Sequence, residues 1–204
     1  MSVEMSSSAY AHWLAGYRRD GVPEVQGWLN NNMFEILDAV HHIQRGLGVR
    51  GGIAEIGVHH GRFFLPLNAM VEVNEGPSFA IDLFEDQAMN IDSSGKGDRN
   101  KFEENLKRFD RQNGRNVVRI QGDSTRLPAA DIARLREARP KVFSVDGGHT
   151  VEHTISDMEL AASCIHDRGA VFVDDVPSQH WIGVMEGVIC YLQRRPTIWP
   201  VLIG

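Results

Sequence analysis

An α/β fold with a mostly parallel sheet is the fold class that three observations predict for this chain of 204 residues. Short apolar runs alternate with longer segments of helical spacing from about residue 52 onward. Each run has the length of a buried strand and is bounded by loop residues. Two of the later runs pass directly into acidic residues. Because repeated strand–helix units form right-handed crossovers, we expect helices on both faces of the sheet.

The elements follow in order along the chain. Residues 32–46 are expected to form a helix because Phe34, Leu37 and Val40 recur near helical spacing, and Gly46 to Gly52 then interrupt the pattern. The predicted strands are 52–56, 78–82, 116–121, 141–145 and 169–173, with a terminal strand at 197–203. The predicted helices are 9–17, 32–46, 63–73, 99–112, 131–139, 151–166 and 181–194. We expect residues 1–50 to be an N-terminal helical extension, acting as a lid or a subunit contact, and residues 51–204 to form the main domain.

Composition excludes several classes of protein. A net charge of −6 disfavours nucleic acid and anionic membranes as partners, since both require a basic surface. No apolar run approaches the roughly 18 residues of a membrane span, and the first twenty residues contain no apolar targeting core. We therefore expect a cytoplasmic protein.

Acidic residues follow the last two predicted strands of the domain. The run 141–145 leads into Asp146-Gly-Gly-His149, and the run 169–173 leads into Asp174-Asp175. The carboxyl ends of parallel strands are where open α/β sheets bind ligands. Three carboxylates gathered there are costly to bury unless a positive charge joins them. The pattern predicts a site for a hard cation, with His149 beside it as a base.

The first three strands also carry an acid at their ends, so all of the first five predicted strands do. Glu55-Ile-Gly57-Val-His-His-Gly61 opens the first crossover, and its glycines allow a ligand to approach the backbone. The dinucleotide fingerprint G-x-G-x-x-G is absent, which argues against a nicotinamide dehydrogenase. Asp82 and Asp123-Ser124 end the second and third strands. Asp123 taken alone is equally well explained as a helix cap or a turn residue.

Together these residues resemble a known family. The ordered set Glu55-x-Gly57-x-x-x-Gly61, Asp82 and Gly122-Asp123-Ser124 is similar to the motifs of class I S-adenosylmethionine-dependent methyltransferases. The second half resembles their metal-dependent O-methyltransferase branch, in particular the enzymes that methylate sugar hydroxyls of macrolides and other natural products. The resemblance extends over about residues 51–192 and implies a Rossmann-like fold.

The resemblance also implies a role for each matching position. Glu55, Gly57 and Gly61 would line the methionine portion of S-adenosylmethionine, Asp82 would hold its ribose, and Asp123 and Ser124 would lie near its adenine. Asp146, Asp174 and Asp175 would bind Mg²⁺, and His149 would be the general base. The expected activity is Mg²⁺-dependent methylation of a hydroxyl on a small molecule, in particular a sugar of a natural product or a glycoside.

Several alternatives stay open at this level. A diverged member of the fold could use the metal for hydroxylase-like or other chemistry, and a cofactor-binding module could lack catalysis. His149 and His153 are four residues apart, which suggests zinc, but no third soft ligand accompanies them. The class usually ends in an antiparallel hairpin, and only its first strand is expected before Gly204. The incomplete hairpin would leave a sheet edge exposed, which makes a homo-oligomer plausible.

Overall fold

A five-stranded, wholly parallel sheet with the order β3-β2-β1-β4-β5 forms the centre of the molecule. The structure is a computed structural model, and it describes residues 9–194 and 198–202. The strands are β1 (Ile53–Ile56), β2 (Ser78–Asp82), β3 (Val117–Gln121), β4 (Val142–Val145) and β5 (Ala170–Val173). The predicted fold class is confirmed, and each of these strands lies within one residue of its predicted bounds.

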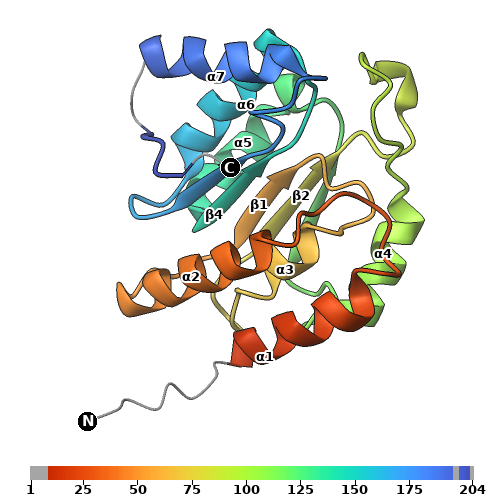
Figure 1. Cartoon of the computed structure of the whole chain (residues 1–204), viewed down its shortest axis with the longest axis vertical. Coiled ribbons are helices and arrows are strands. Elements are labelled where there is room, and N and C mark those ends of the chain that lie inside the picture. Colours follow the sequence, from red (N-terminus) through yellow and green to blue (C-terminus); the bar gives the residue numbers. More distant parts are fainter. Residues whose placement is uncertain (1–8, 195–197, 203–204) are drawn as a thin grey trace.

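Helices cover both faces of the sheet, with α1 to α4 on one side and α5 and α6 on the other (Figure 1). The helices are α1 (Ala9–Gly16), α2 (Met33–Gly46), α3 (Phe64–Asn68), α4 (Arg99–Phe109), α5 (Ala129–Ala138), α6 (Val151–Cys164) and α7 (Ile182–Arg194). A π-helical turn, Tyr17–Gly21, extends α1. Helix α7 lies along α6 in the outermost layer (Figure 1). Among the described residues, none of the helices has the length and apolar character needed to cross a bilayer.

Two hydrophobic cores result from the alternation of side chains along the strands. Ile53 points into the core that contains Phe34 of α2 and Phe64 of α3. The next residue, Ala54, belongs to the opposite core, together with Leu135 of α5. A period of two residues produces this division, since successive strand residues face opposite sides of a sheet. Helices α1 and α2 share the first core with the sheet, while the predicted domain boundary at residue 50 stays a prediction.

The strand order reverses at the centre of the sheet, between β1 and β4. The two strands pair in register from Ile53↔Val142 to Ile56↔Val145. Gly57 and Asp146 therefore leave the sheet at the same level, one from each half of the chain. In open α/β sheets the crevice at such a reversal is where ligands bind.

Two predicted helices, α3 and α4, end at least three residues earlier than expected. Helix α3 stops at Asn68 rather than continuing to residue 73. Beyond it, the carbonyl oxygens of Ala69 and Val71 accept hydrogen bonds from Arg111 and Gln112, at 2.7 and 3.1 Å. These side chains take the place of further helical bonds and turn the chain toward β2. Helix α4 ends at Phe109 rather than residue 112, because the Asp110 side chain accepts the next free backbone N–H groups.

The predicted terminal strand is wrong for the part of it that can be assessed. Residues 198–202 are described and do not form a strand, and their apolar side chains at Trp199, Val201 and Leu202 are exposed. Without a neighbouring strand, an apolar sequence has no ladder of hydrogen bonds that fixes it as a strand. The remaining residues of the predicted strand, 197 and 203, lie outside the described residues.

Candidate active site

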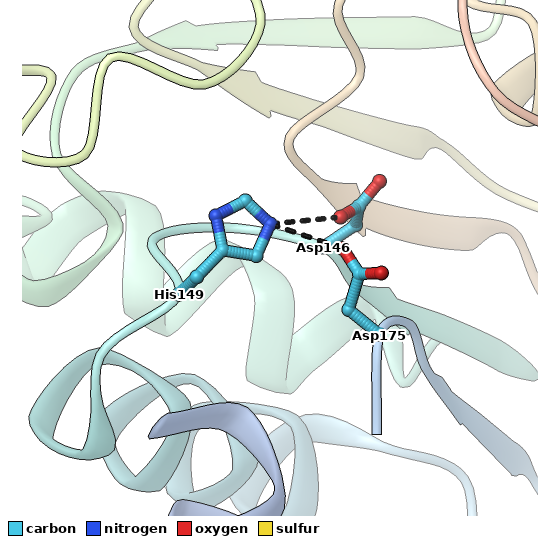
Figure 2. Close-up of side chains that lie close together, drawn as sticks. All are labelled: Asp146, His149 and Asp175. Carbon is cyan, nitrogen blue, oxygen red and sulfur yellow. Dashed lines mark ion pairs between the residues drawn. The ribbon is translucent and has the colours of Figure 1, made fainter. Parts of the chain in front are cut away.

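The acidic residues after β4 and β5 meet at one point beyond the carboxyl edge of the sheet. His149 lies between two of them, with its Nε2 atom 3.3 Å from Oδ2 of Asp175 and 4.0 Å from Oδ1 of Asp146 (Figure 2). Each of the three residues offers one possible ligand atom, and these atoms lie within 4.8 Å of one another. The strand ends therefore create a compact group of two carboxylates and an imidazole, open enough to accept a cation.

Asp174, the third predicted metal ligand, lies next to this group and does not belong to it. As a residue Asp174 is exposed, whereas the side chains of Asp146 and Asp175 are each about one third exposed, at 32%. The neighbouring Asp175 has a positive φ of 58°, an unusual conformation that Asp tolerates better than most residues. Such backbone conformations cluster at functional sites.

Negative charge accumulates around Asp146. Burial, followed by the charges of Asp174 and Glu55, raises the pKa of Asp146 well above its ordinary value. Although the residue is exposed overall, desolvation of its carboxyl group raises the pKa of Asp174, and the adjacent Asp175 adds to the effect. Groups that repel one another in this way bind a cation with a gain in free energy, because the cation removes the repulsion. Oxygen-rich ligands favour a hard ion such as Mg²⁺.

Three contacts fix the imidazole of His149. The ring of Trp181 stacks on it, with ring centroids 4.2 Å apart and planes 17° from parallel. Asp92 contacts its Nδ1 atom at 2.7 Å and accepts a hydrogen bond from its backbone N–H at 3.0 Å. The Oγ atom of Ser94 lies 3.2 Å from the same Nδ1 atom. A small cavity of about 10 Å³, the size of about one water molecule, lies between His149 and Asp146.

Glu55, in β1, is a buried carboxylate with an unused oxygen. The residue is 1% exposed. Its Oε1 atom accepts a long hydrogen bond from Ser144 Oγ at 3.4 Å, and its Oε2 atom has no partner within the described part of the chain. Burial is the main reason that the pKa of Glu55 lies well above its ordinary value. A buried, unpaired acid is costly, so a positively charged ligand group is expected to satisfy it.

The two predicted loop glycines have the backbone conformations that require glycine. Gly57 has φ +84°, and a Cβ atom placed there would lie 1.8 Å from the carbonyl oxygen of Asp146. Gly61 has φ +89°, and its Cβ would meet the ring of Phe102 at 2.9 Å. The first loop thus touches the loop that carries Asp146, so the predicted cofactor and cation residues are direct neighbours.

The remaining predicted cofactor residues differ in their surroundings. Asp82 accepts hydrogen bonds from the backbone N–H groups of His59 and Phe84, at 2.7 and 2.6 Å. These bonds hold its carboxylate at the end of β2, close to the first loop. Asp123 caps the 3₁₀ turn Ser124–Arg126 by accepting from the backbone N–H of Thr125 at 2.9 Å. The capping role considered for Asp123 is therefore present, and a cofactor role for Asp123 and Ser124 stays a prediction.

Asp157 in α6 is a buried acid that sequence reasoning did not single out. The residue is 1% exposed, and neither carboxylate oxygen makes a regular hydrogen bond within the described residues. Burial raises the pKa of Asp157 to about 7, with the nearby Asp123 adding to the shift and the Ser124 hydroxyl opposing it. This group is consequently neutral in the folded protein over a pH range in which an unfolded chain ionises it.

Folding stability is expected to depend on pH through Asp157. The pKa of Asp157 is raised in the folded protein. Its contribution to folding stability is therefore fully present below the unfolded pKa of about 3.9 and is lost as the pH rises through about 7. Between pH 5 and pH 8, the free energy of unfolding of the original chain should therefore fall by about 2 to 3 kcal/mol more than that of Asp157→Asn. Urea unfolding at the two pH values measures the difference. Asp167→Asn, at a largely exposed acid, is the control and should show the pH dependence of the original chain. The same pH dependence in Asp157→Asn would contradict the raised pKa of Asp157.

Sequence reasoning missed Asp92 and left Trp181 without a role. Asp92 lies in a Gly- and Ser-rich segment with no periodic pattern, and only the folded loop brings it to His149, 57 residues later. His153 does not join the cluster, because its Nδ1 atom pairs with Thr150 Oγ1 at 2.9 Å. Within the described residues, the geometry therefore does not support a zinc site built on His149 and His153.

The family model and the fold together identify a methyltransferase. The sequence model of a family described as a methyltransferase domain matches residues 54–176, which begin within β1, extend past β5 and include the cluster around His149. The chain belongs to this family. Comparison with curated proteins gave no match.

Solved structures share the fold at low sequence identity. The O-methyltransferase NovP is 17% identical, with a TM-score of 0.60 over 79% of this chain and 72% of its own. CalS11, a TDP-rhamnose 3′-O-methyltransferase of calicheamicin biosynthesis, is 15% identical, with a TM-score of 0.57 over 90% and 82%. TomG from Streptomyces achromogenes, solved with SAM, is 16% identical, with a TM-score of 0.54 over 91% and 76%. At these identities the likeness establishes the fold.

Proposed function

We propose that this protein is an S-adenosylmethionine- and Mg²⁺-dependent O-methyltransferase that acts on a hydroxyl of a small molecule. The observation that carries the proposal is the cluster of Asp146, His149 and Asp175 beside the unpaired carboxylate of Glu55. One part of this site suits a cation, and the adjoining part suits a positively charged cofactor. Membership of the methyltransferase family supplies the class of reaction.

The residues around the first loop fit S-adenosylmethionine. Glu55 is buried with a free oxygen, which suits the positive charges of the methionine portion. Gly57 and Gly61 would leave room for that portion along the backbone. Asp82 would hold the ribose hydroxyls, and Asp123 and Ser124 would lie near the adenine.

The acidic residues fit a divalent cation in the same way. Asp146 and Asp175 would hold Mg²⁺ through oxygen atoms, with the neighbouring Asp174 as the third predicted ligand. When bound, the sulfonium group provides an electrophilic methyl, and the cation lowers the pKa of the acceptor hydroxyl. His149 would accept the hydroxyl proton at Nε2 as the new C–O bond forms and the C–S bond breaks. Much of the remaining rate enhancement would come from holding the hydroxyl in line with the methyl group.

A sugar hydroxyl is the proposed acceptor. NovP and CalS11 are O-methyltransferases, and CalS11 acts on a TDP-linked sugar. The motif Asp146-Gly-Gly-His149 with Asp174-Asp175 resembles the sugar-methylating branch of the family. We therefore propose a natural product sugar or a related glycoside. A screen of hydroxylated acceptors with a labelled methyl donor would identify the substrate.

Calorimetry tests the cofactor directly. S-adenosylmethionine should bind the chain with a dissociation constant between about 1 µM and 1 mM, the usual range for enzyme substrates. Glu55→Gln should weaken this binding at least about tenfold, because the buried oxygen loses its charge. The exposed Glu104→Gln is the matched control on α4, and NAD⁺ is the control ligand that shares the adenosine group. A folded chain that fails to bind S-adenosylmethionine would reject the proposal.

A further inference from the structure

The loop between β2 and α4 crosses the carboxyl edge of the sheet and contacts both parts of the site. Near its start, Asn90 Nδ2 donates to the carbonyl oxygens of Ser94 and Gly95, at 2.8 and 3.1 Å, which closes the loop on itself. At its other end, a Cβ atom on Gly97 would lie 2.5 Å from Oδ1 of Asp82. The loop is therefore a folded segment packed against the predicted cofactor residues.

Asp92 joins this loop to His149 through two hydrogen-bond contacts and makes two more within the loop. Its Oδ1 atom accepts from the backbone N–H and the Oγ–H of Ser94, at 2.9 and 2.6 Å. Its Oδ2 atom accepts from the backbone N–H of His149 at 3.0 Å and contacts Nδ1 of the ring at 2.7 Å. Although burial alone would raise it, these bonds from Ser94 and His149 hold the pKa of Asp92 well below its usual range. The Asp92 side chain is thus an ionised carboxylate with a fixed orientation.

An ionised carboxylate can only accept hydrogen bonds, and this determines where the imidazole carries its proton. Nδ1 of His149 must be the protonated nitrogen that faces Asp92. In the neutral ring, Nε2 then carries the lone pair, directed toward Asp146 and Asp175 (Figure 2). Stacking on Trp181 restricts rotation of the ring. A base at this position requires that tautomer, because a protonated Nε2 cannot take a proton from an acceptor.

We propose that Asp92 is the positioning residue that sets the tautomer and orientation of His149. The inference deepens the proposed function and rests on it for the role of the imidazole as a base. Without Asp92, the Asp175 carboxylate, 3.3 Å from Nε2, would favour the tautomer that carries its proton on Nε2. The lone pair of Nε2 would then hold that proton and could not accept one from a substrate. The Ser94 hydroxyl supports the arrangement by fixing Asp92.

Nitrogen NMR of ¹⁵N-histidine-labelled protein reads the tautomer directly. Spectra are taken without Mg²⁺ at about pH 9, well above the ordinary histidine pKa of about 6.5, and the His149 signals are those lost in His149→Gln. The ratio of Nδ1–H to Nε2–H should fall at least about tenfold in Asp92→Ala, since a hydrogen bond to a charged group is removed. A smaller fall is expected in Asp92→Asn, which keeps an acceptor oxygen and decides the question if the alanine variant does not fold.

Asp86→Asn is the matched control, because Asp86 lies on the same loop but contacts Gln121 rather than His149. Its tautomer ratio should equal that of the original chain. An unchanged ratio in both Asp92 variants would overturn the positioning role. Titration with S-adenosylmethionine separates this result from the proposed function, because Asp92→Asn should retain cofactor affinity. Failure of the original chain to bind S-adenosylmethionine rejects the methyltransferase mechanism, whatever the NMR ratio is.

Discussion

Asp146→Asn is expected to lower the Mg²⁺-dependent rate of methyl transfer at least about a thousandfold, with S-adenosylmethionine affinity changed by less than about threefold. A thousandfold loss corresponds to about 4 kcal/mol of transition-state stabilisation, within the several kcal/mol that a metal ion supplies. Asp146 is the residue in which the two parts of the site meet, next to Gly57 and facing His149. Transfer of a labelled methyl group to a panel of hydroxylated acceptors measures the rate. Calorimetry measures the affinity of the variant and of the original chain for S-adenosylmethionine.

Unfolding cannot account for that loss. The negative charges around Asp146 and its burial already oppose ionisation of its side chain, so a neutral amide should leave the melting temperature equal or higher. Asp167→Asn, at an exposed surface ion pair with Arg139, controls for the loss of one acidic group. Full Mg²⁺-dependent activity in Asp146→Asn would reject the proposed cation site.

Gly57→Ala is the second change with a large expected effect, here on folding. The new Cβ would overlap the carbonyl oxygen of Asp146 at 1.8 Å, and φ at this residue is +84°. Both obstacles concern backbone, so no side-chain rotation can relieve them, and we expect a loss of about 3 to 5 kcal/mol in the free energy of unfolding. Urea denaturation followed by circular dichroism measures this loss.

Gly46→Ala is the matched control for that experiment. Gly46 is the last residue of α2, and a Cβ placed there would meet nothing within 4 Å. Alanine in a helix is favoured over glycine, so the control should be stabilised by up to about 1 kcal/mol. Equal stability of the Gly57→Ala variant and the original chain would show that the two loops are not in contact.

The strands and the two clusters of acid could be predicted from sequence because each depends on local pattern. An apolar run such as 141–145 predicts a buried strand whichever strand it pairs with. The acid that follows such a run then lies at the carboxyl edge of the sheet because the strands are parallel. Helix ends were predicted less well, because side chains distant in sequence decide them. Arg111, for example, takes the carbonyl oxygen of Ala69 just beyond α3.

Asp92 shows where sequence reasoning stops. Nothing in the segment around it has helical or strand periodicity, so no pattern places its carboxylate on Nδ1 of His149. Asp157 was hidden for a different reason, since a single acid in an amphipathic helix is ordinarily on the solvent side. In both cases the tertiary fold determines the environment of the carboxyl group, and the environment determines its chemistry.

The strand order also bears on how the site is assembled as the chain folds. Residues up to Ser124 carry every predicted cofactor position, and residues from Asp146 onward carry every predicted cation position. Among the strand pairs of the described residues, only that of β1 with β4 joins these halves, and its first pair, Ile53↔Val142, closes a large segment of chain. Contacts between such distant residues carry a high loop-closure entropy and slow the folding of a domain. A nascent chain that extends past Ser124 therefore carries every predicted cofactor residue, and it acquires the predicted cation residues only when β4 enters the centre of the sheet.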